Sequence, residues 1–262
     1  MKRIPFLMTL GAGLVAAGER KPKELPVPGE SFLLDGREAF LIVPENRGSG
    51  RTPWVWYAPT LPGLPGPEER WMFAQFLAAG IAVAGIDAGE SYGSPDGCRI
   101  YDRLYAEMTG KRGMSAKPVM LGRSRGGLMT LSWAAGRPDC CGGFAGIYPV
   151  CDLTSYPGLA KACGAFGLSE TGLAEKLREH NPVDRLSGLA KAGVPFFAVH
   201  GDVDTLVPLE KNSGALASRY RELGGSMELI VPKGQGHNMW EGFFRCAELV
   251  AFVKKHAKGI AP

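Results

Sequence analysis

Short runs of apolar residues alternate along the chain with longer segments in which apolar residues recur at helical spacing. Continuous apolar runs of this kind are typical of β-strands that are buried on both faces. The runs that we interpret as strands are residues 31–34, 37–43, 54–58, 81–86, 119–121, 144–150, 195–199 and 227–231. The segments with helical spacing are residues 69–79, 100–108, 128–135, 209–223 and 243–255. This alternation predicts an α/β fold with a mostly parallel central sheet and helices on both faces.

Polar stretches rich in glycine and proline separate these elements. Asp35-Gly36 lies between the first two strands, and this dipeptide is a strong signal for a β-hairpin. Residues 60–67 and 87–97 are expected to be loops. Residues 151–192 are polar and interrupted, with one or two short helices, and they are the only expected position for a lid. The predicted cap over the sheet is therefore minimal.

Residues 118–133, with the sequence PVMLGRSRGGLMTLSW, are the most informative stretch of the chain. A short buried strand leads into Gly-x-Ser-x-Gly, with Ser124 at its centre, and an apolar helix follows. This order is that of a nucleophile elbow, in which a sharp turn exposes the serine hydroxyl above the sheet. The strained turn needs neighbours without a Cβ atom, here Gly122 and Gly126. The alternative is a glycine-rich turn with an incidental serine.

The composition is that of a globular protein with one core. Of its 262 residues, 45% are hydrophobic and 21% are charged, which excludes a disordered chain. The net charge of +4 is small and the basic residues are dispersed, so no nucleic-acid partner is expected. No CxxC pair lies near a histidine, so no metal site is expected, and no cofactor is predicted.

The N-terminus has the pattern of a secretory signal. Lys2 and Arg3 precede an apolar run that is too short to cross a membrane and that ends in small residues suited to a signal peptidase. The predicted division of the chain is a signal peptide, an extended leader and a single catalytic domain, over residues 1–18, 19–30 and 31–262. The protein is expected to be secreted or periplasmic, with no membrane span after cleavage; a frayed N-terminal helix is the alternative. Export allows disulfides among the six cysteines, although their spacing selects no pairing.

A serine nucleophile needs a base and an acid that orients the base. His237 lies in a glycine-rich loop between the last strand and the last helix, at the sheet edge where α/β folds bind ligands, and it is the predicted base. His200 closes a strand and is interpreted as a structural hydrogen-bonding residue. Asp204 is the favoured acid, whereas Asp202 is expected to cap the turn and Asp152 is a lower-ranked substitute. The order serine, acid, histidine along the chain supports this choice.

Two motifs identify the family that the chain resembles: GRSRGG at residues 122–127 and HGDVDTLVP at residues 200–208. They resemble those of the α/β-hydrolases of the dienelactone hydrolase and prolyl-oligopeptidase-like branch, and the resemblance covers most of residues 40–257. It implies an α/β-hydrolase fold. It also implies that the second aspartate of the second motif, Asp204, is the acid and that His237 is the base.

The resemblance further implies an oxyanion hole made of backbone N–H groups. One N–H comes from Arg125, the residue after the nucleophile. The other comes from the loop after the strand that ends near Ala58. Thr60 and Leu61 are the candidates there, because the neighbouring prolines have no N–H. The chain lacks the HGG-type motif of many relatives at this position, so the choice between the two residues stays open.

Four side chains on the surrounding loops are candidates for substrate binding: Arg125, Glu90, Tyr92 and Trp240. The sequence Gly-x-Ser-Arg-x-Gly is similar to that of the glucuronoyl esterases, in which the arginine after the serine assists the oxyanion beside a uronate substrate. The similarity implies that the Arg125 guanidinium binds the oxyanion or an acidic group of the substrate. The alternative is an ion pair with Glu90 or Asp152 that braces the loop.

The predicted function is that of a secreted serine carboxylesterase that works through an acyl-enzyme. Its expected substrates are small-molecule or glycan-linked esters, in particular carbohydrate-linked or acidic ones. A serine exopeptidase is one alternative. The peptidases of this branch carry a large N-terminal propeller, for which the residues ahead of the predicted domain are too few. A non-catalytic binding module on a hydrolase scaffold is the other alternative, although such a module is expected to have lost a member of the triad.

Overall fold

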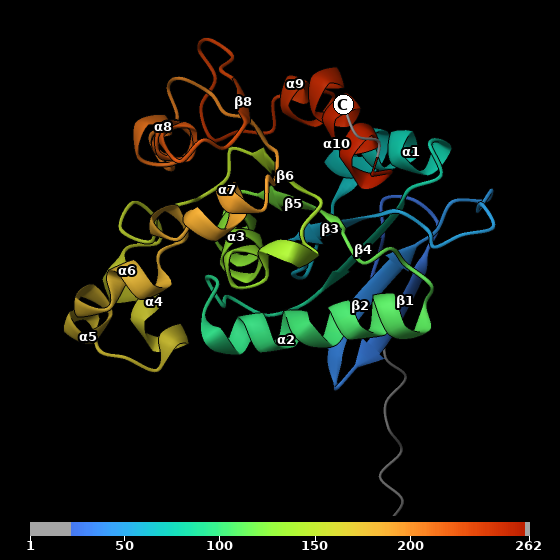
Figure 1. Ribbon diagram of the computed structural model, residues 1–262, viewed down its shortest axis with the longest axis horizontal. Coiled ribbons are helices and arrows are strands. Elements are labelled where there is room, and N and C mark those ends of the chain that lie inside the picture. Colours follow the sequence, from blue (N-terminus) through green and yellow to red (C-terminus); the bar gives the residue numbers. More distant parts are fainter. Residues whose placement is uncertain (1–21, 260–262) are drawn as a thin grey trace, which may run out of the picture.

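The computed structural model describes residues 22–259, which fold around one eight-stranded sheet (Figure 1). The predicted signal peptide, residues 1–18, lies outside the described residues. Across the sheet the strands are β1 (Glu30–Leu34), β2 (Arg37–Ile42), β4 (Ala82–Ile86), β3 (Trp54–Ala58), β5 (Val119–Arg123), β6 (Gly143–Ile147), β7 (Phe196–Val199) and β8 (Met227–Ile230). β1 and β2 form the predicted antiparallel hairpin, and β2 pairs antiparallel with β4. From β4 to β8 every pair is parallel, so the carboxyl ends of these strands share one edge.

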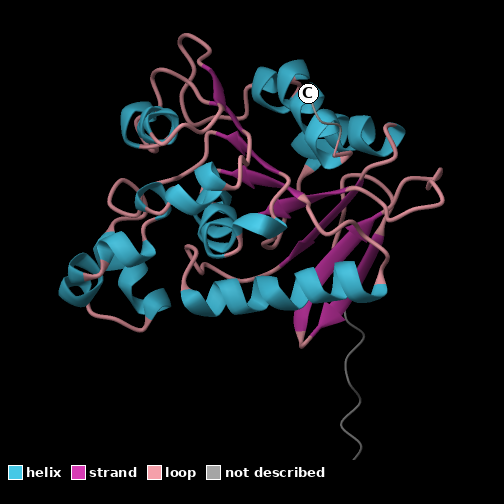
Figure 2. Ribbon diagram, in the orientation of Figure 1, coloured by secondary structure: helices cyan, strands magenta, loops and turns pink. Residues whose placement is uncertain are grey.

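Helices cover both faces of the sheet (Figure 2). One face is covered by α1 (Arg70–Ala78), α9 (Glu241–Phe244) and α10 (Ala247–Ala257), whose apolar residues share one core with the strands. The other face is covered by α2 (Pro95–Ala106), α3 (Gly126–Gly136), α7 (Ser187–Lys191) and α8 (Ser213–Glu222), which share a second core. The predicted α/β class is therefore confirmed.

The inner strands are buried on both faces, which explains why the sequence shows them as continuous apolar runs. Every residue of β3, β4, β5 and β6 is buried. In the second core the ring of Trp56 packs on those of Tyr101 and Trp133, with centroids 5.0 and 4.7 Å apart. Two separate cores hold the sheet rigid between them, and this fixes the positions of the loops at its carboxyl edge.

Several boundaries differ from the sequence-based expectation. α2 begins at Pro95 instead of residue 100, because the Ser94 hydroxyl caps the helix by accepting a hydrogen bond from the N–H of Gly97 at 3.3 Å. β6 ends at Ile147, before a residue with a left-handed backbone, Tyr148 (φ 34°). The expected last helix is divided between α9 and α10 at Arg245. α8 begins at residue 213, after a 3-10 turn over 209–211.

The polar stretch after β6 holds more helices than expected. It forms α4 (Leu159–Ala162), α5 (Glu170–Glu175) and α6 (Leu177–His180) before α7. Figure 1 shows α4, α5 and α6 gathered on one side of the molecule, away from α1 and α10. Their apolar residues, including Ala162 and Leu173, pack with Tyr92 and Leu128 in a third cluster. This small subdomain is thus built onto the loop after β4 and the start of α3.

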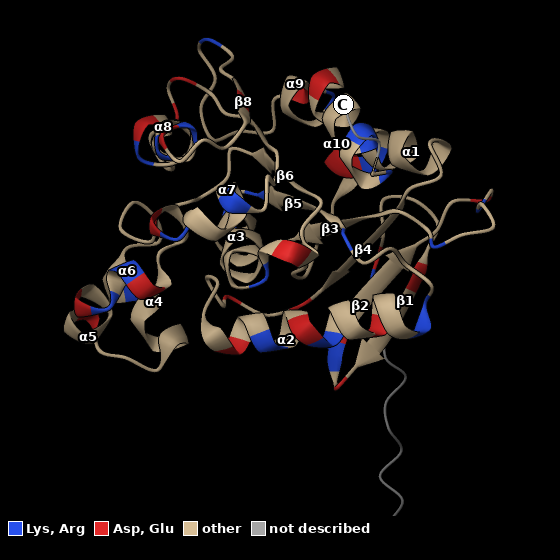
Figure 3. Ribbon diagram, in the orientation of Figure 1, with Lys and Arg blue, Asp and Glu red and all other residues tan. Residues whose placement is uncertain are grey.

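The six cysteines are free thiols, so the expected disulfides are not formed. The thiols of Cys98, Cys141 and Cys151 contact backbone carbonyl oxygens instead of one another. None of the helices within residues 22–259 has the length and apolar character needed to cross a membrane. Figure 3 shows basic and acidic segments interleaved along α2.

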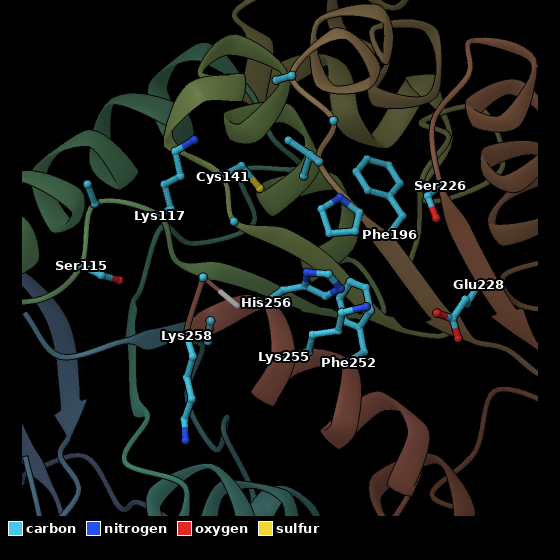
Figure 4. A pocket seen from close by; sticks show the side chains of 18 residues that line it. Ser115, Lys117, Cys141, Phe196, Ser226, Glu228, Phe252, Lys255, His256 and Lys258 are labelled. Carbon is cyan, nitrogen blue, oxygen red and sulfur yellow. The ribbon is translucent and has the colours of Figure 1, made fainter. Parts of the chain in front are cut away.

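A cavity of about 830 Å³ lies at the edge of the sheet where the parallel strands begin (Figure 4). Lys117 and Ser226 line it just before β5 and β8, and Phe252 and His256 line it from α10. Ser124, Asp204 and His237 do not line this cavity, because they follow the opposite, carboxyl ends of the strands.

The close packing at Gly126 leads to a prediction about the junction of β5 and α3. A Cβ atom at this position would lie 2.0 Å from the carbonyl oxygen of Ala58 and 2.5 Å from the nitrogen of Pro59. Because both obstacles are backbone atoms, Gly126→Ala should lower the free energy of unfolding by about 1–3 kcal/mol or more, measured by urea denaturation. The matched control is Gly136→Ala in the same helix, where nothing lies within 4 Å. Equal stability of the two variants would contradict this close packing.

Candidate active site

Ser124 sits at a sharp turn between β5 and α3, with a left-handed backbone (φ 51°). Its N–H donates to the carbonyl of Ile147 at 2.9 Å, and its own carbonyl accepts from the N–H of Val150 at 2.8 Å. A Cβ atom on Gly122 would lie 2.9 Å from the backbone of Gly127. The flanking glycines therefore allow the backbones of β5, α3 and the neighbouring loops to approach closely, as an elbow requires.

His237 is positioned between Ser124 and Asp204. Its Nε2 lies 2.9 Å from the Oγ of Ser124, and its Nδ1 lies 2.7 Å from Oδ2 of Asp204. A carboxylate accepts hydrogen bonds, so the neutral ring carries its proton on Nδ1 and leaves Nε2 free to accept from the serine hydroxyl. The ring of Tyr148 packs against the imidazole at 4.3 Å between centroids. The histidine thus has its acceptor nitrogen aimed at the serine.

Asp204 is fully buried at its side chain and is held by several donors. Its Oδ1 accepts from the N–H groups of Leu206 and Val207 at 3.0 and 2.8 Å, and its Oδ2 faces both His237 and His200. Burial alone raises the pKa of this carboxyl, but the hydrogen bonds from His200, Val207 and His237 lower it to about 2. Asp204 therefore stays ionised beside the imidazole.

The other predicted candidates make different contacts. Asp202 accepts from the N–H of Gly234 at 2.7 Å, and Asp152 accepts from Thr154 and from the side chain of Asn181. His200 is completely buried between the Ser213 hydroxyl and the carbonyl of Val207, both 2.8 Å away. Its ring orients the turn that carries Asp204.

The pKa of His237 is lowered from its ordinary value of 6.5. Burial is the largest cause and the neighbouring His200 and Arg123 lower the pKa further, whereas Asp204 acts in the opposite direction. The imidazole is therefore neutral at neutral pH, in the form that can accept a proton.

The two proposed sources of oxyanion N–H groups lie against each other. Ala58 and Pro59 pack against the first turn of α3 at Gly126, and Thr60 and Leu61 follow them in the loop after β3. Thr60 directs its hydroxyl toward the carbonyl of Tyr57 at 3.3 Å. Lys23 of the leader donates to the carbonyl of Leu61 at 2.7 Å, a contact that the sequence did not indicate. Within residues 22–259, the N–H of Arg125 donates to no backbone carbonyl outside its helix.

Arg125 extends from the elbow toward Glu90, and its Nε lies 2.9 Å from Oε2 of that carboxylate. The angle does not satisfy a hydrogen bond, so this is an ion pair. Its terminal nitrogens have no hydrogen-bond partner within residues 22–259. Tyr92 is 5% exposed and largely covered by the third apolar cluster, whereas Trp240 is 41% exposed.

A buried ion pair beside the nucleophile was missed by sequence reasoning. The Arg123 guanidinium donates to Oε1 of Glu69 at 2.6 Å, and Glu69 has no exposed side-chain surface. Arg123 occupies a variable position of the Gly-x-Ser-x-Gly motif, and Glu69 lies in a 3-10 turn (Pro67–Glu69) ahead of α1. A charged residue at the end of an apolar strand was the single available signal.

Solved structures of other proteins have the same fold. The acylaminoacyl peptidase of Pyrococcus horikoshii superposes with a TM-score of 0.70 at 16% identity, over 90% of this chain and 42% of that one. A puromycin-hydrolyzing peptidase of Mycobacterium tuberculosis has a TM-score of 0.68 at 18% identity, over 87% and 39%. Est1E of Butyrivibrio proteoclasticus has a TM-score of 0.64 at 19% identity, over 88% and 99%. This chain thus spans about two fifths of the length of the two peptidases, and the likeness shows the α/β-hydrolase fold.

The family is shown by the sequence itself. No curated protein has significant sequence similarity to this chain. The model of the prolyl oligopeptidase family matches residues 107–259, which is more than half of the chain and includes Ser124, Asp204 and His237. The chain belongs to the prolyl oligopeptidase family of serine hydrolases.

Proposed function

We propose that the protein is a carboxylesterase that works through an acyl-enzyme formed on Ser124. The observation that carries this proposal is the unbroken series of contacts from Ser124 through His237 to Asp204, at 2.9 and 2.7 Å. His237 takes the serine proton on Nε2 as Oγ attacks the ester carbonyl, and then gives that proton to the leaving alcohol. A water molecule, activated by the same histidine, hydrolyses the acyl-enzyme. Asp204 holds the imidazole in the required tautomer and stabilises its charged form.

The negative oxygen of the tetrahedral intermediate needs fixed donors. The N–H of Arg125 lies at the start of α3, where the helix dipole favours negative charge. The N–H of Thr60 or Leu61 is the proposed second donor, because the close packing of Gly126 against Ala58 brings this loop to the elbow. Donors that are already in place need no rearrangement as the charge develops, and this is the main source of stabilisation in acyl transfer.

The support for an ester substrate comes from the charges beside the nucleophile. An exopeptidase that binds the amino terminus of a peptide needs a carboxylate available to the ammonium group. Glu90 is engaged by Nε of Arg125 instead, and the terminal nitrogens of that guanidinium have no hydrogen-bond partner among residues 22–259. This arrangement favours a neutral or acidic substrate group over a cationic one.

Apolar side chains flank the other side of the site. Val203 and Leu206 are exposed in the loop that carries Asp204, and Met239 and Trp240 are exposed in the loop that carries His237. The two loops meet through the contact between His237 and Asp204. They offer an aromatic or sugar ring of the substrate a surface to pack on, which supports carbohydrate-linked esters.

Peptidase activity is the second candidate, and the family match favours it. The catalytic groups are the same for both reactions, so the choice depends on turnover. The decisive comparison is a panel of aryl, acetyl-sugar and uronate esters measured beside aminoacyl and acylaminoacyl amides. Faster turnover of the amides would indicate a peptidase instead of an esterase. The absence of both turnover and fluorophosphonate labelling would indicate a non-catalytic binding module.

Ser124→Ala should retain the fold and lose essentially all esterase activity, because no other group can form the acyl-enzyme. His237→Ala should be about as damaging, and the double variant should be little worse than either single one, since the residues act as a unit. Turnover, fluorophosphonate labelling with peptide mapping, and thermal unfolding measure these effects. Turnover of Ser124→Ala at the level of the original protein would refute the assignment.

Asp204→Asn should lower kcat at least about a hundredfold, because the imidazole then loses its preferred tautomer. Asp202→Asn and Asp152→Asn are matched controls, since these carboxylates bind Gly234 and the Thr154 turn instead of His237. Esterase kinetics on the three variants decide the assignment. A larger defect from Asp152→Asn would transfer the role of the acid to the loop after β6.

Arg125→Met keeps the backbone N–H and removes the guanidinium. We expect kcat/KM for a carboxylate-bearing ester to fall about ten- to a hundredfold, while the matched neutral ester changes little, since a charged hydrogen bond contributes about 1.5–3 kcal/mol. Glu90→Gln is the complementary variant and should raise kcat/KM for the acidic ester by releasing Arg125. Equal losses on both esters would indicate oxyanion assistance, and no loss on either would leave Arg125 with its structural ion pair.

We also propose that residues 1–18 are removed on export and that the protein acts outside the cytoplasm. The support is the pattern of charge and small residues at the N-terminus, which precedes the described residues. N-terminal sequencing of exported protein should begin near Glu19. An intact Met1 in a cytoplasmic fraction would exclude the signal peptide.

A further inference from the structure

The ion pair between Arg123 and Glu69 is buried directly beside the nucleophile. The side chain of Arg123 is 6% exposed and that of Glu69 is fully buried. Glu69 also accepts from the Tyr57 hydroxyl at 2.9 Å and from the N–H of Gly66 at 2.8 Å. Its carboxylate oxygens thus accept from three donors, one on β3, one on β5 and one at the start of its own turn.

A buried ion pair is weak support for stability, because the cost of removing two charges from water offsets much of their attraction. Burial by itself lowers the pKa of Arg123, but the neighbouring Tyr57 and Glu69 raise it above its ordinary value, so the guanidinium stays charged. The pair is better explained by what the guanidinium does with its remaining donors.

The second terminal nitrogen of Arg123 reaches the loop that carries His237. It lies 2.9 Å from Sδ of Met239, two residues after the histidine, and the guanidinium lies over the ring of Phe244 in α9 at 4.9 Å. Arg123 therefore connects the residue before the nucleophile to the loop after the base and to the helix that follows this loop.

The contacts of Met239 continue to the imidazole. The hydroxyl of Tyr148 lies 4.0 Å from Sδ of Met239, and the ring of Tyr148 packs on the imidazole of His237. Tyr148 itself is fixed by an edge contact with Phe243, at 4.9 Å between ring centroids. One sulfur atom thus lies between Arg123 and the aromatic ring that supports the base.

The half of the loop that contains Met239 is not held in place by burial. Met239 is 58% exposed, and residues 231–240 contain no helix or strand. The first half of the loop is attached to the turn after β7, where the N–H of Val203 donates to the carbonyl of Gln235 at 3.1 Å. In the second half, the Asn238 side chain accepts from the N–H of Trp240, a contact internal to the loop. Arg123 supplies an attachment to the sheet.

We propose that Arg123, held in place by Glu69, is a positioning residue that fixes the Met239 loop and so keeps His237 within hydrogen-bond distance of Ser124. The proposal rests on the proposed function for its effect on turnover, but the fixing of the loop stands independently of the reaction. Arg123 touches no reacting atom. Its effect is on the geometry and the charge around the base.

The charge has a predictable direction. The groups that face His237 are Ser124, Asp204, His200, Arg123 and Tyr148. Burial raises the pKa of Tyr148 to about 12, so its phenol is neutral. The positive charge of Arg123 disfavours protonation of the imidazole. Removing it should raise the pKa of His237 and move the acidic limb of the kcat/KM profile to higher pH, and removing the Glu69 carboxylate as well offsets part of this shift.

The test removes both charges together, in the double variant Arg123→Met/Glu69→Gln, so that no unpaired charge is left buried. We expect kcat to fall about ten- to a hundredfold with little change in KM, the acidic limb to move to higher pH, and amide hydrogen exchange over residues 236–244 to accelerate. The matched control is Arg245→Met/Glu241→Gln, which removes an exposed ion pair from α9. The control should leave all three measurements unchanged.

Two single variants keep the test decisive if the double variant does not fold. Met239→Ala removes an exposed side chain and should preserve the melting temperature within about 2 °C, yet lower kcat and speed loop exchange. Arg123→Lys keeps the charge and should retain the position of the acidic limb while losing part of kcat. If the original protein has no esterase activity but amide exchange in the loop is faster in these variants, the proposed function is contradicted and the positioning role is supported. Unchanged loop exchange in Met239→Ala and the double variant would overturn it.

Discussion

The left-handed backbone of Ser124 is the constraint around which the other parts of the site are arranged. A non-glycine residue in this conformation costs about 1–2 kcal/mol, and the hydrogen bonds of its N–H to Ile147 and of its carbonyl to Val150 offset that cost. After the same turn α3 begins directly against Ala58, the last residue of β3 before the loop of Thr60 and Leu61. The strain at one residue thus assembles the serine, the helix terminus and the second candidate oxyanion loop at a single edge of the sheet.

Asp204 serves the fold and the site with different oxygen atoms. Its Oδ1 closes the turn after β7 through the N–H groups of Leu206 and Val207, while Oδ2 is left to His237 and His200. Because the turn fixes the buried carboxylate, the imidazole has a hydrogen-bond partner whose position is set by the protein backbone. His200 contributes through the same turn, and its hydrogen bond to the Val207 carbonyl makes it part of the support for the acid.

The sheet and the three residues Ser124, Asp204 and His237 could be predicted because their signals are local. Strands buried on both faces appear as apolar runs, and parallel strands place the loops at their carboxyl ends along one edge. The pair of Arg123 and Glu69 could not be predicted, because the two residues are 54 positions apart and each looks ordinary in its own segment. The contact of Lys23 with Leu61 escaped for the same reason. The start of α2 at Pro95 is hard to predict although Ser94 and Pro95 form a good helix N-terminus, because both lie among the glycines of the expected loop over residues 87–97.

Two arginines flank the nucleophile, and their burial separates their roles. The Arg123 side chain is 6% exposed and is committed to Glu69 and Met239, so it cannot reach a substrate without leaving a buried carboxylate unpaired. The Arg125 side chain is 27% exposed, and its partner Glu90 is 45% exposed, so solvent screens this pair and its loss costs little. A substrate anion can therefore compete with Glu90 for Arg125, whereas no ligand can compete with Glu69 for Arg123. In our proposals, the sequence Arg-Ser-Arg thus places a cation that positions the base and a cation that can bind the substrate on either side of the same serine.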